Sequence, residues 1–167
     1  GALIKKHARG TASYLKSCVT YAAERSKTEN NGELVFYEEE TQKNDENTLK
    51  RIGAIHQSAI NDCDGFYLCY QPIVDADTEQ LIGAEALLRW HNEEFGEVPP
   101  GIFIPWLEND PEFWDLGNWI IRRALEQGKQ LLEHYPNFVM NVNLAYPQLA
   151  HAGFVEIVKT IVDETGY

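Results

Sequence analysis

The chain has few cysteines, and none of them are in a metal-binding arrangement. Cys18, Cys63 and Cys69 form no Cys-x-x-Cys pair. This spacing excludes the common zinc-ribbon patterns and does not suggest a disulfide framework. The simplest interpretation is three reduced thiols, and we expect a cytoplasmic protein.

Basic residues are also scarce. The chain has 14 Lys and Arg against 26 Asp and Glu, for a formal net charge of −12. Proteins that bind DNA or RNA neutralise backbone phosphates with Lys and Arg, so the composition argues against a nucleic-acid polymer as partner. An acidic domain can still bind a small anionic ligand where a metal ion supplies local positive charge.

Long apolar runs are missing as well. No run approaches the length of about 20 residues that a membrane-spanning helix needs, and no secretory signal pattern is present. The hydrophobic content of 44% is ordinary for a globular protein, and 167 residues allow one domain or one domain plus a fragment. We therefore expect a globular chain with no membrane segment.

The stretch GAEALLRW, from Gly83 to Trp90, organises the rest of the chain. A strand has a period of two residues, which places Glu85 and Arg89 on one face and only apolar side chains on the other. On an isolated segment, a solvent-facing strand would explain these charges. Charged side chains that face an interior instead require a partner or a metal ion.

A hairpin is predicted around this stretch. Phe66–Val74 and Leu81–Trp90 both have strand patterns, and only Asp75–Gln80 connect them. This connection is too short for a helical crossover, so the two strands should pair antiparallel. In that hairpin we expect Gln71 and Glu85 on the same face.

A third strand is predicted from Phe138 to Asn143. Phe138, Met140 and Val142 should face one way, and Val139, Asn141 and Asn143 the other. Asparagine at a strand end is commonly turn chemistry, which would be sufficient for Asn143 alone but explains the Asn141–Asn143 pair less well.

Helical periodicity and turn signals predict the remaining elements. We expect helices over residues 3–27 with an interruption near Gly10, over Thr48–Ile60, around Phe103 and Trp106, over Pro111–His134 with Asp110 as N-cap, and over Ala152–Glu164. Thr48–Ile60 should bury Leu49, Ile52, Ile55, Ala59 and Ile60. We expect a linker over Glu38–Asn47 and a loop over His91–Pro100.

Four blocks of sequence resemble the EAL domain family, phosphodiesterases that hydrolyse the bacterial second messenger cyclic di-GMP. They are QPI at Gln71–Ile73, EALLRW at Glu85–Trp90, FIP at Phe103–Pro105 and VNL at Val142–Leu144. Their order and spacing match the family over about residues 64–167, the first half or less of such a domain. The resemblance implies an α/β fold, an incomplete TIM-like (β/α) barrel whose first strand runs antiparallel to its neighbours.

The resemblance also implies a site. In the family, the positions of Glu85 and Asn143 bind Mg²⁺ or Mn²⁺, and those of Gln71 and Arg89 contact cyclic di-GMP. The residue types suit these roles, since oxygen ligands bind such cations and a guanidinium can bind phosphate with two hydrogen bonds. Ala145 departs from the family, which commonly has Ser there.

The larger departure is that several motifs of the family's site do not occur in this sequence. The family completes its site with a Glu-x-Thr-Glu strand, an Asp-Asp motif and a lysine, which would follow Tyr167. We therefore expect this chain not to hydrolyse cyclic di-GMP to linear pGpG, although an intact parent would, and we expect it to form a homo-oligomer that shields its open strand edge. The alternative function is a non-catalytic cyclic di-GMP sensor or protein-interaction module on a degenerate EAL scaffold.

The first 40 residues resemble the end of a GGDEF domain, the diguanylate cyclase fold. Tyr21, Ala23, Gly32 and Phe36 match its final helix, turn and strand. The motif that names that family is absent, so no cyclase activity follows. The expected division is a GGDEF-like remnant over 1–40, a linker and connecting helix over 41–63, and the EAL portion over 64–167.

Overall fold

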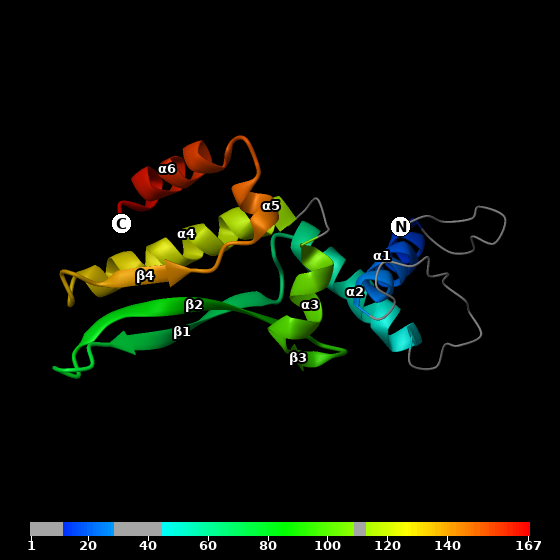
Figure 1. Ribbon diagram of the computed structural model, residues 1–167, viewed down its shortest axis with the longest axis horizontal. Helices are drawn as coiled ribbons and strands as arrows, with labels where there is room; N and C mark the ends of the chain where they lie inside the picture. The colour runs from blue at the N-terminus through cyan, green and yellow to red at the C-terminus, as the bar shows by residue number, and fades with distance from the viewer. Residues whose placement is uncertain (1–11, 29–44, 109–112) are drawn as a thin grey trace.

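The computed structural model describes residues 12–28, 45–108 and 113–167 (Figure 1). Its helices are α1 (Ala12–Thr28), α2 (Asp45–Ile60), α3 (Pro100–Leu107), α4 (Phe113–Leu132), α5 (Tyr146–Leu149) and α6 (Phe154–Thr165). Its strands are β1 (Phe66–Val74), β2 (Leu81–Asn92), β3 (Gly96–Val98) and β4 (Val139–Val142). None of the helices in these ranges is long and apolar enough to span a membrane.

The four strands form one sheet around β2. On one edge β2 pairs antiparallel with β1, so the predicted hairpin is confirmed. On the other edge it pairs antiparallel with β3 near Trp90 and parallel with β4 between Gly83 and Ala86. The residue opposite Glu85 on β1 is Gln71, which confirms that these two residues share a face.

Helix α4 covers the apolar face of the sheet, and α6 lies on the far side of α4 (Figure 1). Ala84 and Ala86 of β2 and Met140 of β4 are buried in one cluster with Ala124 of α4. Alanine side chains are short, so the helix can approach the strands closely. This packing leaves the alternate side chains of β1, β2 and β4 on the face turned away from α4.

A second core lies where the hairpin meets α2 and α3. Trp90 and Phe103 are fully buried, and their ring centroids are 6.3 Å apart in an edge-to-face arrangement. The indole Nε1 of Trp90 donates a hydrogen bond to Ser58 Oγ on α2 at 3.0 Å. Gly65 precedes β1 with φ +79°, and a Cβ there would lie 2.4 Å from the His91 carbonyl oxygen. This core therefore connects the EALLRW and FIP blocks of the sequence.

The expected loop over His91–Pro100 is wrong. Strand β2 continues to Asn92, and β3 returns beside it. The Asn92 side chain accepts hydrogen bonds from the backbone N–H groups of Glu94 and Phe95 at 3.0 and 3.3 Å, and Gly96 has φ +64°. Asn at the start of a turn and Gly at a position with positive φ are both turn residues, so Asn92 and Gly96 together were a signal for this hairpin. The short helix α5 was also not expected.

The predictions for the N-terminal part are confirmed only in part. Helix α2 starts at Asp45, inside the expected linker, and it buries Leu49, Ile52, Ile55 and Ala59 as predicted. Ile60 is 48% exposed, contrary to prediction, because it is the last residue of the helix. The expected interruption near Gly10, the strand after Gly32 and the Asp110 N-cap lie outside the described residues.

Candidate functional site

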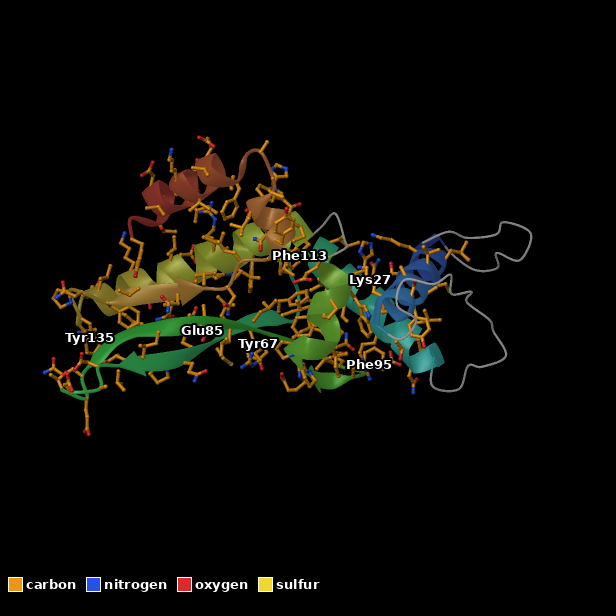
Figure 2. All side chains as sticks on the ribbon, in the orientation of Figure 1. Lys27, Tyr67, Glu85, Phe95, Phe113 and Tyr135 are labelled. Carbon is orange, nitrogen blue, oxygen red and sulfur yellow. The ribbon has the colours of Figure 1, made fainter. Side chains whose placement is uncertain are left out.

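Three polar side chains lie in one row across the sheet. Gln71 of β1 is the register partner of Glu85 on β2, and Glu85 is the partner of Asn141 on β4. All three lie on the face turned away from α4, because their strand neighbours are packed against that helix. Glu85 is half-buried near the middle of β2 (Figure 2).

Asn143 joins this row from just beyond the end of β4. Its Nδ2 donates a hydrogen bond to Glu85 Oε1 at 2.6 Å. The two predicted metal ligands are therefore in direct contact, although 58 positions separate them in the sequence. Asn141 was not among the predicted site residues, and its alternation with Asn143 was the signal that placed it on this face.

Arg89 lies on the same face, further along β2. It is four positions beyond Glu85, so the two backbones are about 13 Å apart along the strand. Its Nη1 donates a hydrogen bond to the backbone oxygen of Leu88 at 2.9 Å, and its register partner on β1 is Tyr67. The predicted ligand-binding side chains are thus spread along one face rather than gathered at one point.

Glu85 and Asn143 fit the requirements of a hard divalent cation. Each has a side-chain oxygen, and a half turn of the Asn143 amide exchanges its nitrogen for oxygen beside the carboxylate. In the part of the chain that the structure describes, no three His, Cys, Asp or Glu side chains gather as a metal cluster. These two residues would therefore supply part of a coordination sphere, with other oxygen ligands completing it.

Cys69 lies on the polar face between the predicted ligand-binding positions. It is the register partner of Leu87, between the Gln71–Glu85 and Tyr67–Arg89 pairs, and it is exposed. Cys18 and Cys63 are buried. Burial raises the pKa of the Cys63 thiol, and the nearby carboxylates of Asp115 and Asp62 raise it further. Cys69 is therefore the accessible thiol that can report on this face.

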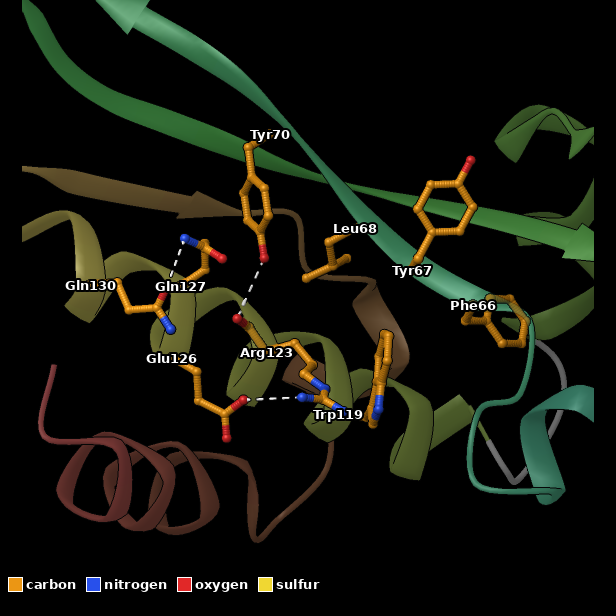
Figure 3. A pocket seen from close by; sticks show the side chains of 9 residues that line it. All are labelled: Phe66, Tyr67, Leu68, Tyr70, Trp119, Arg123, Glu126, Gln127 and Gln130. Carbon is orange, nitrogen blue, oxygen red and sulfur yellow. Dashed lines mark hydrogen bonds and ion pairs between the residues drawn. The ribbon is translucent and has the colours of Figure 1, made fainter.

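A cavity of about 340 Å³ lies on the opposite side of β1, against α4 (Figure 3). Its polar groups already have partners: Arg123 pairs with Glu126 at 3.5 Å and lies over the Trp119 ring, and Gln127 donates to Gln130 at 3.3 Å. In Figure 3, Leu68 and Tyr70 face this cavity, whereas the Tyr67 ring is directed to the other side of the strand. The cavity is thus separate from the polar row.

The sequence model of the EAL domain matches residues 54–167 of the chain. Over 93 residues the chain is 38% identical to the bifunctional diguanylate cyclase/cyclic di-GMP phosphodiesterase MucR of Pseudomonas aeruginosa. Over 98 residues it is 33% identical to the cyclic di-GMP phosphodiesterase PA2567 of the same organism. These alignments cover 55% and 59% of this chain but only 14% and 17% of those proteins.

The fold is similar to that of the MucR phosphodiesterase solved in complex with cyclic di-GMP. The TM-score is 0.64 at 31% identity, over 70% of this chain. The chain spans 47% of the length of that structure.

Proposed function

Because the chain belongs to the EAL domain family, we propose that it forms part of the substrate site of a metal-dependent cyclic di-GMP phosphodiesterase. In this proposal Glu85 and Asn143 hold Mg²⁺ or Mn²⁺, Arg89 binds a phosphate and Gln71 hydrogen-bonds a base or phosphate edge. The observation that supports it is the 2.6 Å contact between Asn143 Nδ2 and Glu85 Oε1, beside Gln71 on the same face.

The reaction requires charge stabilisation and an activated water. Hydrolysis forms a bond between a water oxygen and phosphorus and breaks one ester P–O bond, which opens the cyclic dinucleotide to linear pGpG. A divalent cation at Glu85 would offset phosphoryl charge and lower the pKa of a bound water. The two-pronged guanidinium of Arg89 would hold a phosphate in place, and Gln71 would orient the ligand across the sheet.

Hydrolysis itself needs more groups than this polar face supplies. The polar face offers Glu85 as the carboxylate beside Asn143, whereas a hydrolytic metal site needs further ligands and a proton acceptor. We propose that this chain contributes ligand binding and part of the metal site, and that groups outside this polar face supply the further ligands and the proton acceptor.

We also propose that the chain belongs to a cytoplasmic signalling protein. Its EAL portion covers residues 64–167 and follows a GGDEF-like remnant over 1–40 and a linker with connecting helix over 41–63. The support for this proposal is the sequence pattern, together with the start of α2 at Asp45.

Alkylation of Cys69 tests the proposed binding directly. A ligand that extends from Gln71 to Arg89 must cover Cys69, so cyclic di-GMP with Mg²⁺ should slow its reaction with iodoacetamide in a saturable manner. Glu85→Gln should remove the Mg²⁺ dependence, because the near-isosteric amide lacks the charge that holds the cation. In a longer, active version, the same substitution should abolish hydrolysis.

Glu133→Gln is the matched control, because Glu133 is exposed beyond the end of α4. This variant should keep the protection of the unaltered chain. An alkylation rate that saturating cyclic di-GMP and Mg²⁺ leave unchanged would overturn the proposal. Wild-type turnover by Glu85→Gln in the longer version would show that Glu85 is not a metal ligand.

A further inference from the structure

Glu97 is held between two side chains at the β3 end of the sheet. The Tyr67 hydroxyl donates a hydrogen bond to Glu97 Oε2 at 2.8 Å, and His91 Nδ1 lies 3.0 Å from Glu97 Oε1. The three residues come from β1, β2 and β3, and we call them the Glu97 clamp. The hydrogen bond to Glu97 raises the pKa of Tyr67, which is consistent with a phenol that donates to the carboxylate.

The clamp continues the polar face beyond Arg89. Tyr67 is the register partner of Arg89, and His91 is the partner of Glu97. His91 is two positions beyond Arg89 on β2, so its backbone lies about 7 Å further along the strand, and Glu97 lies opposite His91 on β3. Figure 2 shows Tyr67 nearer than Glu85 to this end of the sheet.

The carboxylate of Glu97 remains able to accept further hydrogen bonds. A carboxylate has about four acceptor positions, and the two described partners use one on each oxygen. The Glu97 side chain is 59% exposed. Arg89 Nη1 donates to the backbone oxygen of Leu88, so this hydrogen bond takes no acceptor position of the Glu97 carboxylate. A carboxylate that recognises a ligand needs a fixed orientation and free acceptor positions, and Glu97 has both.

Closure of the β2–β3 hairpin does not account for the clamp. Backbone pairing and the Asn92 turn already hold that hairpin, and Trp90 and Val98 anchor it in the core. A clamp that served only the hairpin would need no contact with Tyr67, which belongs to β1. The link to Tyr67 fixes the carboxylate over the face on which Gln71 and Arg89 lie.

We propose that Glu97 recognises a guanine base of the bound dinucleotide, with Tyr67 and His91 as positioning residues; this inference rests on the proposed function. Guanine presents two adjacent donors, N1–H and the 2-amino group, which match the two oxygens of a carboxylate. Adenine has no such pair of donors. Hydrogen bonds to a charged acceptor are stronger than neutral ones, so the match would favour guanine.

Isothermal titration of the 167-residue chain in Mg²⁺ tests this assignment with two ligands. They are cyclic di-GMP and its inosine analogue cyclic di-IMP, which lacks the 2-amino groups. The unaltered chain should bind cyclic di-GMP more tightly, and Glu97→Gln should weaken that binding by about tenfold or more. Binding of cyclic di-IMP should fall less, so the preference should shrink. Glu94→Gln, an exposed glutamate in the same hairpin, should behave as the unaltered chain.

Tyr67→Phe is the second variant, because it keeps the ring and removes the donor to Glu97. Its preference for cyclic di-GMP should be intermediate. If Glu97→Gln and Tyr67→Phe weaken the binding of both ligands equally, or leave the binding of both unchanged, the guanine assignment is overturned while the proposed function stands. If the unaltered chain binds no cyclic di-GMP in Mg²⁺, the proposed function is overturned and this inference with it.

Discussion

Glu85 and Asn143 meet because two strands bring different chemical groups to one position. Glu85 is one of the alternate side chains of β2 that face away from α4, and Asn143 follows the matching face of β4. Neither residue needs an unusual backbone, since positive φ among the described non-glycine residues occurs at Asp62, Cys63 and Glu79. At the scale of single residues, the candidate site is thus an ordinary strand face with polar side chains.

The Asp75 carboxylate should make the free energy of unfolding depend on pH. Its Oδ1 accepts hydrogen bonds from the backbone N–H of Thr78 at 2.8 Å, the Thr78 hydroxyl at 2.8 Å and the backbone N–H of Asp77 at 3.1 Å. These bonds favour the charged carboxylate and hold the pKa of Asp75 below its ordinary value. A depressed folded-state pKa contributes stability above the unfolded-state pKa, and this contribution is lost as the pH falls through the folded-state value.

Asp75→Ala should therefore lower the thermal midpoint at neutral pH. The difference between the variant and the unaltered chain should narrow on acidification, once the Asp75 carboxyl of the unaltered chain takes up a proton. Circular-dichroism melts over a series of pH values would measure both. A midpoint difference that is the same at acidic and neutral pH would contradict this role of the charge.

At the scale of elements, the close contact between β2 and β4 aligns the site. A Cβ at Gly83 would lie 2.5 Å from the backbone oxygen of Val139, its register partner on β4. Any side chain there must push the two strands apart, and backbone atoms have little freedom to yield. The glycine just before the EAL block therefore sets the separation between Glu85 and Asn143.

Gly83→Ala should destabilise the chain by about 1–3 kcal/mol, because the added methyl group overpacks the contact between β2 and β4. It should also weaken Mn²⁺ binding, since β4 carries Asn143 away from Glu85. Urea unfolding and Mn²⁺ titration would measure the two effects. Gly101→Ala is the matched control, because a Cβ there meets no atom within 4 Å. Equal stability of both variants would contradict the argument.

At the scale of the whole molecule, the sheet has open edges. Among the described residues β1 pairs only with β2, and so does β4, so the outer edge of each has no strand partner. A (β/α) barrel, which has no such edges, closes with about eight strands. Unpaired strand edges favour pairing with another chain.

We expect the 167-residue chain to self-associate and to show no hydrolysis of cyclic di-GMP with Mg²⁺ or Mn²⁺. Edge pairing between copies or exchange of the N-terminal segment would shield the open edges. Light scattering at several concentrations would test the association, and product analysis after incubation with the dinucleotide would test the activity. A stable monomer would contradict the first expectation, and formation of pGpG the second.

Local features of the sequence determined the hairpin and its polar face. The period of two residues in GAEALLRW separates Glu85 from Ala84 and Ala86, and the short Asp75–Gln80 connection requires antiparallel pairing. Register follows from the same short connection, so the shared face of Gln71 and Glu85 was predictable. These features depend on residues close together in the chain, which is why pattern alone was sufficient.

Only the tertiary structure decided which distant groups meet. Asn143 reaches Glu85 because α4 packs against the apolar sides of both β2 and β4, and because Gly83 allows the two backbones to approach. Tyr67 reaches Glu97 because β3 folds back beside β2, in a segment expected to be a loop. Contacts of this kind depend on how separate elements pack and on the register between them, and no local period in the sequence encodes either.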